Sequence, residues 1–195
     1  LDIVGQVVDV SGADLVVTSV TFDDRLSTAT ILDLRYGLST CVGGEFRFGW
    51  SIGYVDAEYK EFIGPTGEDV ADERVFQNTP DWTAGGVLTY STPLDLFNTS
   101  GLLSVITSLS YRGETSQFEI PTPELDQDAY TLWDLSLVWA QDQGNWSFGL
   151  HGKNLNNKEY KVAGYFFPAL GLENNITAFY GNPRQIWGTV QYNWF

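Results

Sequence analysis

Apolar and polar residues alternate strictly along several stretches of the chain. In residues 46–54 the even positions are Phe46, Phe48, Trp50, Ile52 and Tyr54, whereas the odd positions are small or charged. Successive side chains of a β-strand point to opposite faces, so this pattern predicts a strand with one apolar face. The same pattern predicts strands near residues 82–90, 133–139 and 146–153, and less regular ones at 1–9, 32–38 and 103–111.

The chain ends in a further segment of this kind, "GNPRQIWGTVQYNWF". Ile186, Val190, Tyr192 and Trp194 share one parity, with Gly188 between them. This predicts a terminal strand and raises the expected number to eight.

The connections between these strands alternate in length. Three are short and rich in turn-forming residues, namely "STCVGG", "STPLDLFNTS" and "QDQGN", and the other four run to roughly 15 to 27 residues. The alternation predicts an all-β fold: an antiparallel up-and-down transmembrane β-barrel with about eight strands in this chain, short periplasmic turns and long external loops. With eight strands, both termini are expected on the periplasmic side.

Aromatic residues cluster towards the strand ends on the apolar face. Such rings prefer the boundary between hydrocarbon and headgroups, so we expect membrane girdles there. The expected girdle residues are Trp82, Tyr90, Trp133, Trp139, Trp146, Tyr192 and Trp194.

A soluble β-sandwich or a lipocalin-like barrel would show the same alternation. In those folds the apolar face points into a core and the outer face is dense in charge. Here the polar face is mostly Gly, Ser and Thr, and the acidic residues concentrate in the long connections. The pattern therefore favours the membrane barrel over the soluble folds.

Composition narrows the possible partners. The net charge of -15 argues against nucleic acid, because phosphate binding needs clustered Lys and Arg. No apolar run is long enough for a transmembrane helix. The single cysteine, Cys41, cannot form a disulfide within the chain.

The sequence contains no catalytic constellation. The lone His151 lies on the polar face of a predicted strand without a second His or Cys, and no phosphate loop or nucleophile elbow is present. We therefore expect no enzyme activity, no cofactor and no metal site. Acidic segments 67–73 and 123–128 could offer oxygen ligands to Ca²⁺, but solvated loops are the simpler interpretation.

The last third of the chain carries a recognisable set of residues. Tyr130 and Asp134 begin a strand, "GKNLNNKEY" ends the next one, and "YGNPR" opens the last, with Tyr180, Gly181, Pro183 and Arg184. This set resembles the carboxy-terminal barrel end of TonB-dependent outer-membrane receptors, and the similarity covers most of residues 44–195. Residues 10–30 match least. Asn154, Asn156 and Asn157 can bond to nearby backbone and tolerate left-handed conformations, so we expect a structural role at the strand exit.

The resemblance implies that residues 1–195 are the carboxy-terminal portion of a barrel of about 22 strands, here without its plug domain. It implies a Gram-negative outer-membrane receptor that binds a scarce nutrient, such as a ferric siderophore or another metal chelate. Outer-membrane lipid, the TonB complex acting through the plug, and the barrel-assembly machinery would be its partners. The assembly signal would be Tyr192, Trp194 and Phe195.

Loops on a rigid scaffold carry recognition, so ligand contact is expected from aromatic loop residues. The candidates are Phe62, Phe118, Tyr165, Phe166 and Phe167. The acidic external surface would disfavour anionic ligands. Two alternatives stay open at this point: a small self-closed eight-stranded barrel that acts as a passive pore or structural protein, and a soluble ligand-binding barrel.

Overall fold

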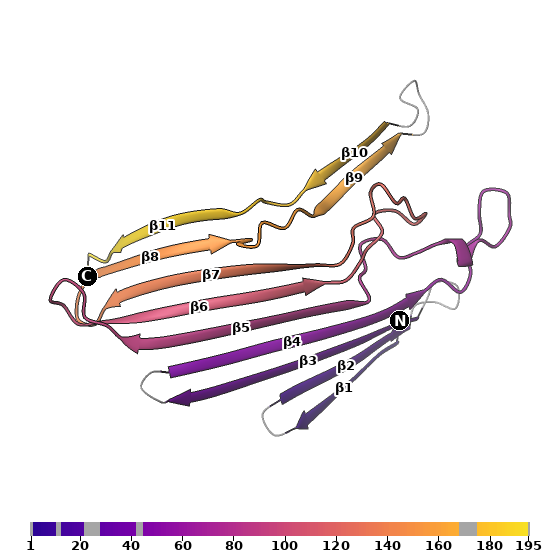
Figure 1. Ribbon diagram of the computed structural model, residues 1–195. Helices are drawn as coiled ribbons and strands as arrows, with labels where there is room; N and C mark the ends of the chain where they lie inside the picture. The colour runs from indigo at the N-terminus through magenta and orange to yellow at the C-terminus, as the bar shows by residue number, and fades with distance from the viewer. Residues whose placement is uncertain (1, 11–12, 22–27, 42–44, 168–174, 195) are drawn as a thin grey trace.

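The computed structural model describes the backbone of residues 2–10, 13–21, 28–41, 45–167 and 175–194, and the side chains from residue 45 onward within these ranges. Most of the chain forms one long antiparallel sheet (Figure 1). Its nine strands lie in the order β1-β2-β3-β4-β5-β6-β7-β8-β11. Their bounds are Asp2–Val10 (β1), Ala13–Thr21 (β2), Thr28–Cys41 (β3), Glu45–Glu58 (β4), Trp82–Pro93 (β5), Gly101–Arg112 (β6), Tyr130–Gln141 (β7), Trp146–Lys153 (β8) and Gln185–Tyr192 (β11).

Two further strands form a separate hairpin between β8 and β11. Strand β9 (Lys161–Phe167) pairs antiparallel with β10 (Asn175–Tyr180) and extends beyond the main sheet (Figure 1). The connection between β4 and β5 contains one turn of 3₁₀-helix, Ala71–Glu73.

The strand register explains why alternating residues specify this sheet. Phe46 lies opposite Tyr90, which lies opposite Val105, and the same row continues through Leu137 and Leu150. The neighbouring row, on the other face, carries Arg47, Thr89, Ile106, Ser136 and His151. A shift by one residue would exchange the two faces, so the sequence pattern fixes the register.

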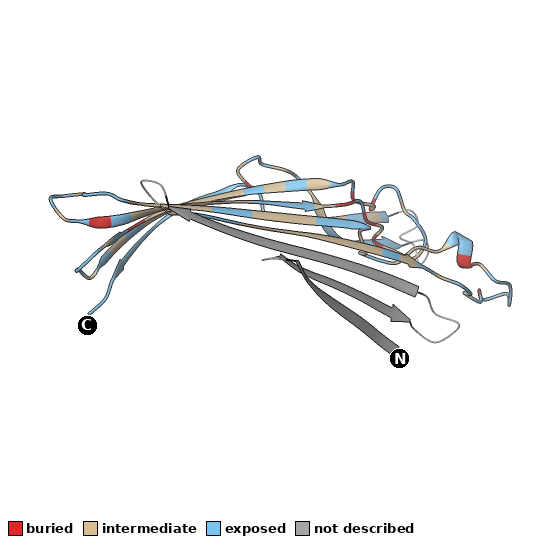
Figure 2. Ribbon diagram, turned by 90° about the horizontal axis from the view of Figure 1, so that it is seen from below, coloured by how far each residue is buried: buried red, intermediate tan, exposed pale blue. Residues whose placement is uncertain are grey.

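The sheet curves as a single layer, and no second layer of the described residues covers its apolar face (Figure 2). Among these residues the buried apolar side chains are those of Ala71, Leu125 and Trp139, whereas large apolar residues of β4 to β8 and β11 are exposed. A soluble sandwich would bury this face in a core. An apolar surface several strands wide instead marks an interaction surface for lipid or protein.

The all-β, antiparallel up-and-down fold is confirmed, but the expected first long loop is wrong. Residues 13–21 form β2, which pairs with both β1 and β3. The main sheet thus has nine strands rather than the expected eight, and β1 starts at the end that carries the long loops. The expectation that both termini lie at the same end is therefore also wrong (Figure 1).

The self-closed eight-stranded barrel is not found. Within the described part of the chain, β1 and β11 are the two edges of an open sheet. No helix in the described residues is long and apolar enough to cross a membrane.

Candidate functional site

Asn154 directly follows β8 and has a left-handed conformation with φ 50°. The side chain is almost fully buried and makes three hydrogen bonds: Nδ2 donates to the carbonyls of Lys158 (2.8 Å) and Asn182 (3.0 Å), and Oδ1 accepts from the amide of Lys158 (2.8 Å). Its own amide donates to Asp134 Oδ1 at 2.8 Å. A short amide side chain thus satisfies the backbone where the strand breaks, as expected for a structural role.

The neighbouring residues of this segment extend the same network. Asn156 bonds both to the amide of Trp133 and to the carbonyl of Thr131, and Asn157, with φ 51°, accepts from the amide of Arg184. The rings of Tyr130 and Tyr160 stack with centroids 4.7 Å apart, and Gly181 lies against Tyr160 with no room for a Cβ. The residues that carry the family resemblance therefore bind three chain segments together. Several of them also line a hollow of about 390 Å³, namely Asn157, Lys158, Tyr180, Gly181 and Pro183.

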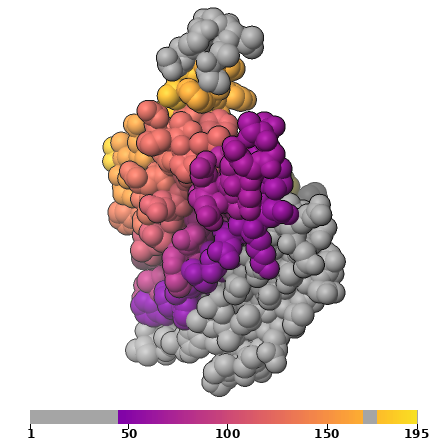
Figure 3. Space-filling view, turned by 90° about the vertical axis from the view of Figure 1, so that its right-hand side faces the viewer, coloured from indigo at the N-terminus to yellow at the C-terminus, as the bar shows by residue number. Residues whose placement is uncertain are grey.

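The two long connections of the main sheet pack against each other at one end of the strands. The amide of Val75 donates to the carbonyl of Glu119 (2.9 Å), and the amide of Asn78 donates to the carbonyl of Ser116 (2.9 Å). Figure 3 looks onto this end and shows residues 58–81 beside residues 113–129. The loops thus form one ordered surface.

The β9–β10 hairpin is anchored to this loop surface at its base. Leu125 is completely buried and lies so close to Gly164 of β9 that a Cβ there would overlap it. The amide of Lys161 donates to Gln127 Oε1 (2.6 Å), and its ammonium group donates to the carbonyl of Asp126 (2.8 Å). One buried Leu and a Lys therefore hold β9 against the β6–β7 connection.

A hollow of about 350 Å³ lies where these three segments meet, and we call it the loop hollow. Two of the five expected ligand residues, Phe118 and Phe166, line it although they are distant in sequence. The other lining residues are Gln77, Glu119, Ile120 and Thr122. Ile120 and Phe166 are partly exposed, by 57% and 40%, so the hollow combines accessible apolar surface with a few polar groups, as small-molecule sites do.

The other three expected residues lie elsewhere. Phe62 belongs to the β4–β5 connection, where the edge of its ring meets Tyr59 at 5.3 Å and the Arg74 guanidinium lies 5.5 Å from its centroid. Tyr165 and Phe167 lie in β9, not in an irregular loop, and have the opposite parity to Phe166. They contact each other, with centroids 6.1 Å apart, and do not line the loop hollow.

A second cleft, of about 550 Å³, opens between the β4–β5 and β6–β7 connections, and its existence was not expected. Tyr59 and Phe76, stacked with centroids 4.3 Å apart, form part of its wall. The pKa of Tyr59 is raised by partial burial and by the nearby Glu119 carboxylate. The charged residues that line the cleft are Glu58, Asp72, Asp81, Glu114, Asp126, Asp128 and Arg74.

Asp72, Asp126 and Asp128 come from the acidic segments 67–73 and 123–128 noted in the sequence, whereas the other three carboxylate residues lie outside these segments. In the part of the chain that the structure describes, no group of three His, Cys, Asp or Glu residues is placed to hold a metal ion.

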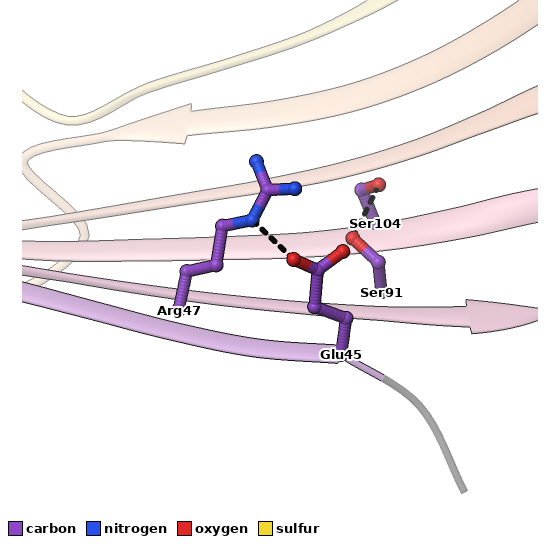
Figure 4. A network of polar contacts seen from close by, with 4 residues as sticks. All are labelled: Glu45, Arg47, Ser91 and Ser104. Carbon is purple, nitrogen blue, oxygen red and sulfur yellow. Dashed lines mark hydrogen bonds and ion pairs between the residues drawn. The ribbon is translucent and has the colours of Figure 1, made fainter. Parts of the chain in front are cut away.

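Several charged and polar groups on the polar face of the sheet pair with near neighbours. Arg47 Nε lies 2.6 Å from Glu45 Oε1, and the hydroxyls of Ser91 and Ser104 are 3.1 Å apart (Figure 4). His151 lies on this face, as expected, between the hydroxyls of Ser136 and Thr189, each 3.0 Å from a ring nitrogen, and stacks on Trp187. Its partners are those of a structural histidine.

Aromatic residues of the apolar face gather towards its two ends. Near the long loops, Trp82 contacts Tyr54 at 4.6 Å, and Trp133 Nε1 donates to Thr107 Oγ1 at 2.8 Å. At the short-turn end lie Tyr90, Trp139, Trp146, Tyr192 and Trp194, with Trp146 and Tyr192 4.7 Å apart. Phe195 lies outside the described residues.

Comparison with protein families gives one match. The family model described as "TonB dependent receptor-like, beta-barrel" matches residues 3–155, which is more than half of the chain. No curated protein matches the chain, and no solved structure matches it.

Proposed function

The chain belongs to the family of TonB-dependent receptor-like β-barrels, and we propose that it is the carboxy-terminal barrel portion, residues 1–195, of a receptor that takes up a scarce nutrient. The family is one of receptors in the outer membrane of Gram-negative bacteria, in contact with membrane lipid and dependent on the TonB system. A ferric siderophore or another metal chelate is the proposed nutrient. The plug domain and the remaining strands would belong to the rest of the receptor.

The single observation that carries this proposal is the loop hollow. Three connections from the same end of the sheet meet there and bring Phe118 and Phe166 together over a cavity of about 350 Å³. Aromatic rings on ordered loops offer a large contact area at a small loss of conformational entropy. This arrangement suits recognition of a small molecule before it enters the barrel.

The charge of the loops adds a preference among ligands. The acidic cleft beside the hollow carries six carboxylate residues and one Arg. Its negative potential repels anions and attracts cations at a distance comparable with the Debye length. Neutral or cationic chelates are therefore the favoured nutrients, and their association rate should fall as salt is added.

The two faces of the sheet fit a barrel wall. The exposed apolar face would meet lipid, with Trp82, Tyr90, Trp133, Trp139, Trp146, Tyr192 and Trp194 as girdles, and the polar face would line the interior. The aromatic end of the chain, Tyr192, Trp194 and Phe195, would be the segment read by the barrel-assembly machinery.

The strand count supports a portion of a larger barrel. In an antiparallel sheet of nine strands the two outer strands run in the same direction, so β1 and β11 cannot pair with each other antiparallel. Closure would need further strands between them.

The test is made on the intact receptor with a panel of ferric siderophores of different net charge. We expect the Phe118→Ala, Phe166→Ala double variant to bind the recognised siderophore at least about tenfold more weakly, because truncation of central aromatic contacts costs about 2 kcal/mol or more. Binding is measured by quenching of intrinsic fluorescence, and uptake by radioactive iron. Phe167→Ala is the matched control, because Phe167 neighbours Phe166 on the other face of β9.

Wild-type affinity in the double variant would contradict the loop hollow as the site. If no siderophore in the panel binds to or supports iron uptake by the wild-type receptor, the proposed nutrient class is wrong. An anionic siderophore preferred over neutral and cationic ones would contradict the role given to the acidic cleft.

A further inference from the structure

A third hollow, of about 340 Å³, lies at the opposite end of the sheet from the loops, and we call it the turn hollow. It is formed between the β5–β6 turn and the apolar face of β7 and β8. Its lining has no charged residue and consists of Leu96, Phe97, Thr99, Trp139, Gln141, Trp146 and Phe148.

Phe97 is unusual in both its backbone and its exposure. Leu96 and Thr99 pair through two backbone hydrogen bonds of 3.0 and 2.9 Å, which leaves Phe97 and Asn98 as the central residues of a two-residue loop. Both have positive φ, 55° and 58°, a combination that favours Asn and Gly. Phe97 adopts this strained conformation with 85% of its surface exposed, so neither local geometry nor burial within the described chain explains a phenylalanine there.

The wall opposite Phe97 is rigid. Trp139 is only 5% exposed, and its indole Nε1 donates to the carbonyl of Leu94 at 2.7 Å. A Cβ on Gly101 would overlap this indole, so the ring is fixed from behind. The Phe148 ring stacks with that of Trp139 at 5.9 Å and meets the edge of Phe97 at 6.4 Å. The hollow is therefore preformed, which lowers the entropic cost of binding.

We propose that the turn hollow seats an acyl chain of a membrane phospholipid. Trp139, Phe148 and Trp146 belong to the apolar face that continues along β7 and β8 through Leu137 and Leu150, so the hollow is continuous with the surface that membership of this outer-membrane family assigns to lipid. A hydrocarbon chain matches the apolar lining, and Thr99 and Gln141 are polar groups suited to the ester region. This inference rests on membership of the outer-membrane family and on the geometry of the hollow at the short-turn end. It does not depend on the proposed nutrient.

The occupant is tested on the intact receptor, purified in mild detergent and washed stepwise to remove lipid. Native mass spectrometry counts the phosphatidylethanolamine molecules that remain. We expect the wild type to retain one phospholipid that both Phe97→Asn and Phe148→Ala lose. Leu109→Ala is the control, because Leu109 is an exposed residue of the same apolar face outside the hollow. Phosphatidylethanolamine added back should restore the bound lipid, whereas glycerophosphoethanolamine, which lacks acyl chains, should not.

Equal retention by the wild type and Phe97→Asn would overturn the proposal. So would an equal loss in Leu109→Ala, which would indicate general contact with lipid. In lipid-free detergent, Phe97→Asn should melt no lower than the wild type, because Asn tolerates positive φ. A clearly lower melting temperature there would show that the Phe97 ring is structural instead.

Discussion

Asn154 illustrates how far single residues could be understood from sequence. A short amide side chain that follows a strand suggested a left-handed exit, and the structure confirms both the positive φ and the backbone bonds. The bond to the carbonyl of Asn182 was not predictable, because it joins segments separated by the whole β9–β10 hairpin. A motif predicts the hydrogen bonds within its own segment, whereas hydrogen bonds to distant segments depend on how the whole fold packs.

Asp69 gives a prediction about pH at the scale of one side chain. Its carboxylate Oδ1 accepts hydrogen bonds from the amides of Phe62 (2.9 Å) and Ala71 (3.1 Å), and these bonds lower the pKa of Asp69. Because the pKa of Asp69 is lower in the folded loop, the stabilisation that its two hydrogen bonds give the loop is fully present above the unfolded pKa of about 3.9. It is lost as pH falls through the lowered folded pKa. At neutral pH the ionised carboxylate of Asp69 should therefore stabilise the loop in full.

We expect Asp69→Ala to speed amide hydrogen exchange of residues 62–71 several-fold at pH 7, measured by mass spectrometry on the intact receptor. Asp72→Ala is the control, because Asp72 is exposed in the same connection and is not among the acceptors of these two amides. Equal protection factors in Asp69→Ala and the wild type at pH 7 would contradict the claim that Asp69 stabilises this loop.

At the scale of elements, strict alternation identified strands correctly where one face is apolar throughout. Strand β8 follows this rule along its length, and β4, β5 and β7 follow it over most of their central residues. Strand β2 was missed because Leu15, Val16 and Val17 are consecutive apolar residues, which obscure a period of two. The β9–β10 hairpin was missed for the same reason, since "YFF" ends β9.

The position of the β9–β10 hairpin gives a prediction about its anchor. Leu125 is fully buried against Gly164, so Leu125→Ala should leave a cavity and release the base of the hairpin. A buried Leu→Ala change costs about 2–5 kcal/mol in a well-packed site. We expect faster cleavage by a protease within residues 161–180, while the main sheet keeps its resistance. Glu124→Ala, a change at an exposed residue beside Leu125 that does not line the loop hollow, serves as the comparison.

Unchanged cleavage in Leu125→Ala would mean that the bonds of Lys161 to Asp126 and Gln127 hold the hairpin without the Leu. Because Phe166 lies in this hairpin and Phe118 in the connection that carries Leu125, release of the anchor should also weaken nutrient binding. Loss of the hairpin and loss of the loop hollow are thus coupled.

At the scale of the whole molecule, the sequence predicted the two faces and the two kinds of connection but not the candidate site. The five expected ligand residues were chosen as aromatic residues of long connections, and the structure places only Phe118 and Phe166 in the loop hollow. The sequence showed the acidic segments 67–73 and 123–128 but not that they meet in one cleft, because their carboxylates come together only when two separate loops pack. Alternation of apolar and polar residues predicts a strand and its two faces. Contacts between loops follow no regular pattern in the sequence, so they could not be predicted in this way.

The strand count has a consequence for orientation that a labelling experiment can test. With nine strands, Asp2 at the start of β1 lies at the same end as Thr66 of the β4–β5 connection, and Asn98 of the β5–β6 turn lies at the other end. If residues 13–21 were a loop, Asp2 would lie at the end of Asn98 instead. Single cysteines at these three positions distinguish the two topologies. They are introduced into a receptor from which all other cysteines have been removed, with Cys41 replaced by Ser.

With the long loops facing outward, a thiol reagent that cannot cross the membrane should label Asp2→Cys and Thr66→Cys on intact cells. Asn98→Cys should react only after the outer membrane is made permeable, and it is the internal control for an intact membrane. Labelling of Asp2→Cys only after permeabilisation would contradict β2 as a spanning strand. The same labelling fixes the end at which phospholipid meets the turn hollow, because Asn98 neighbours Phe97 at its rim.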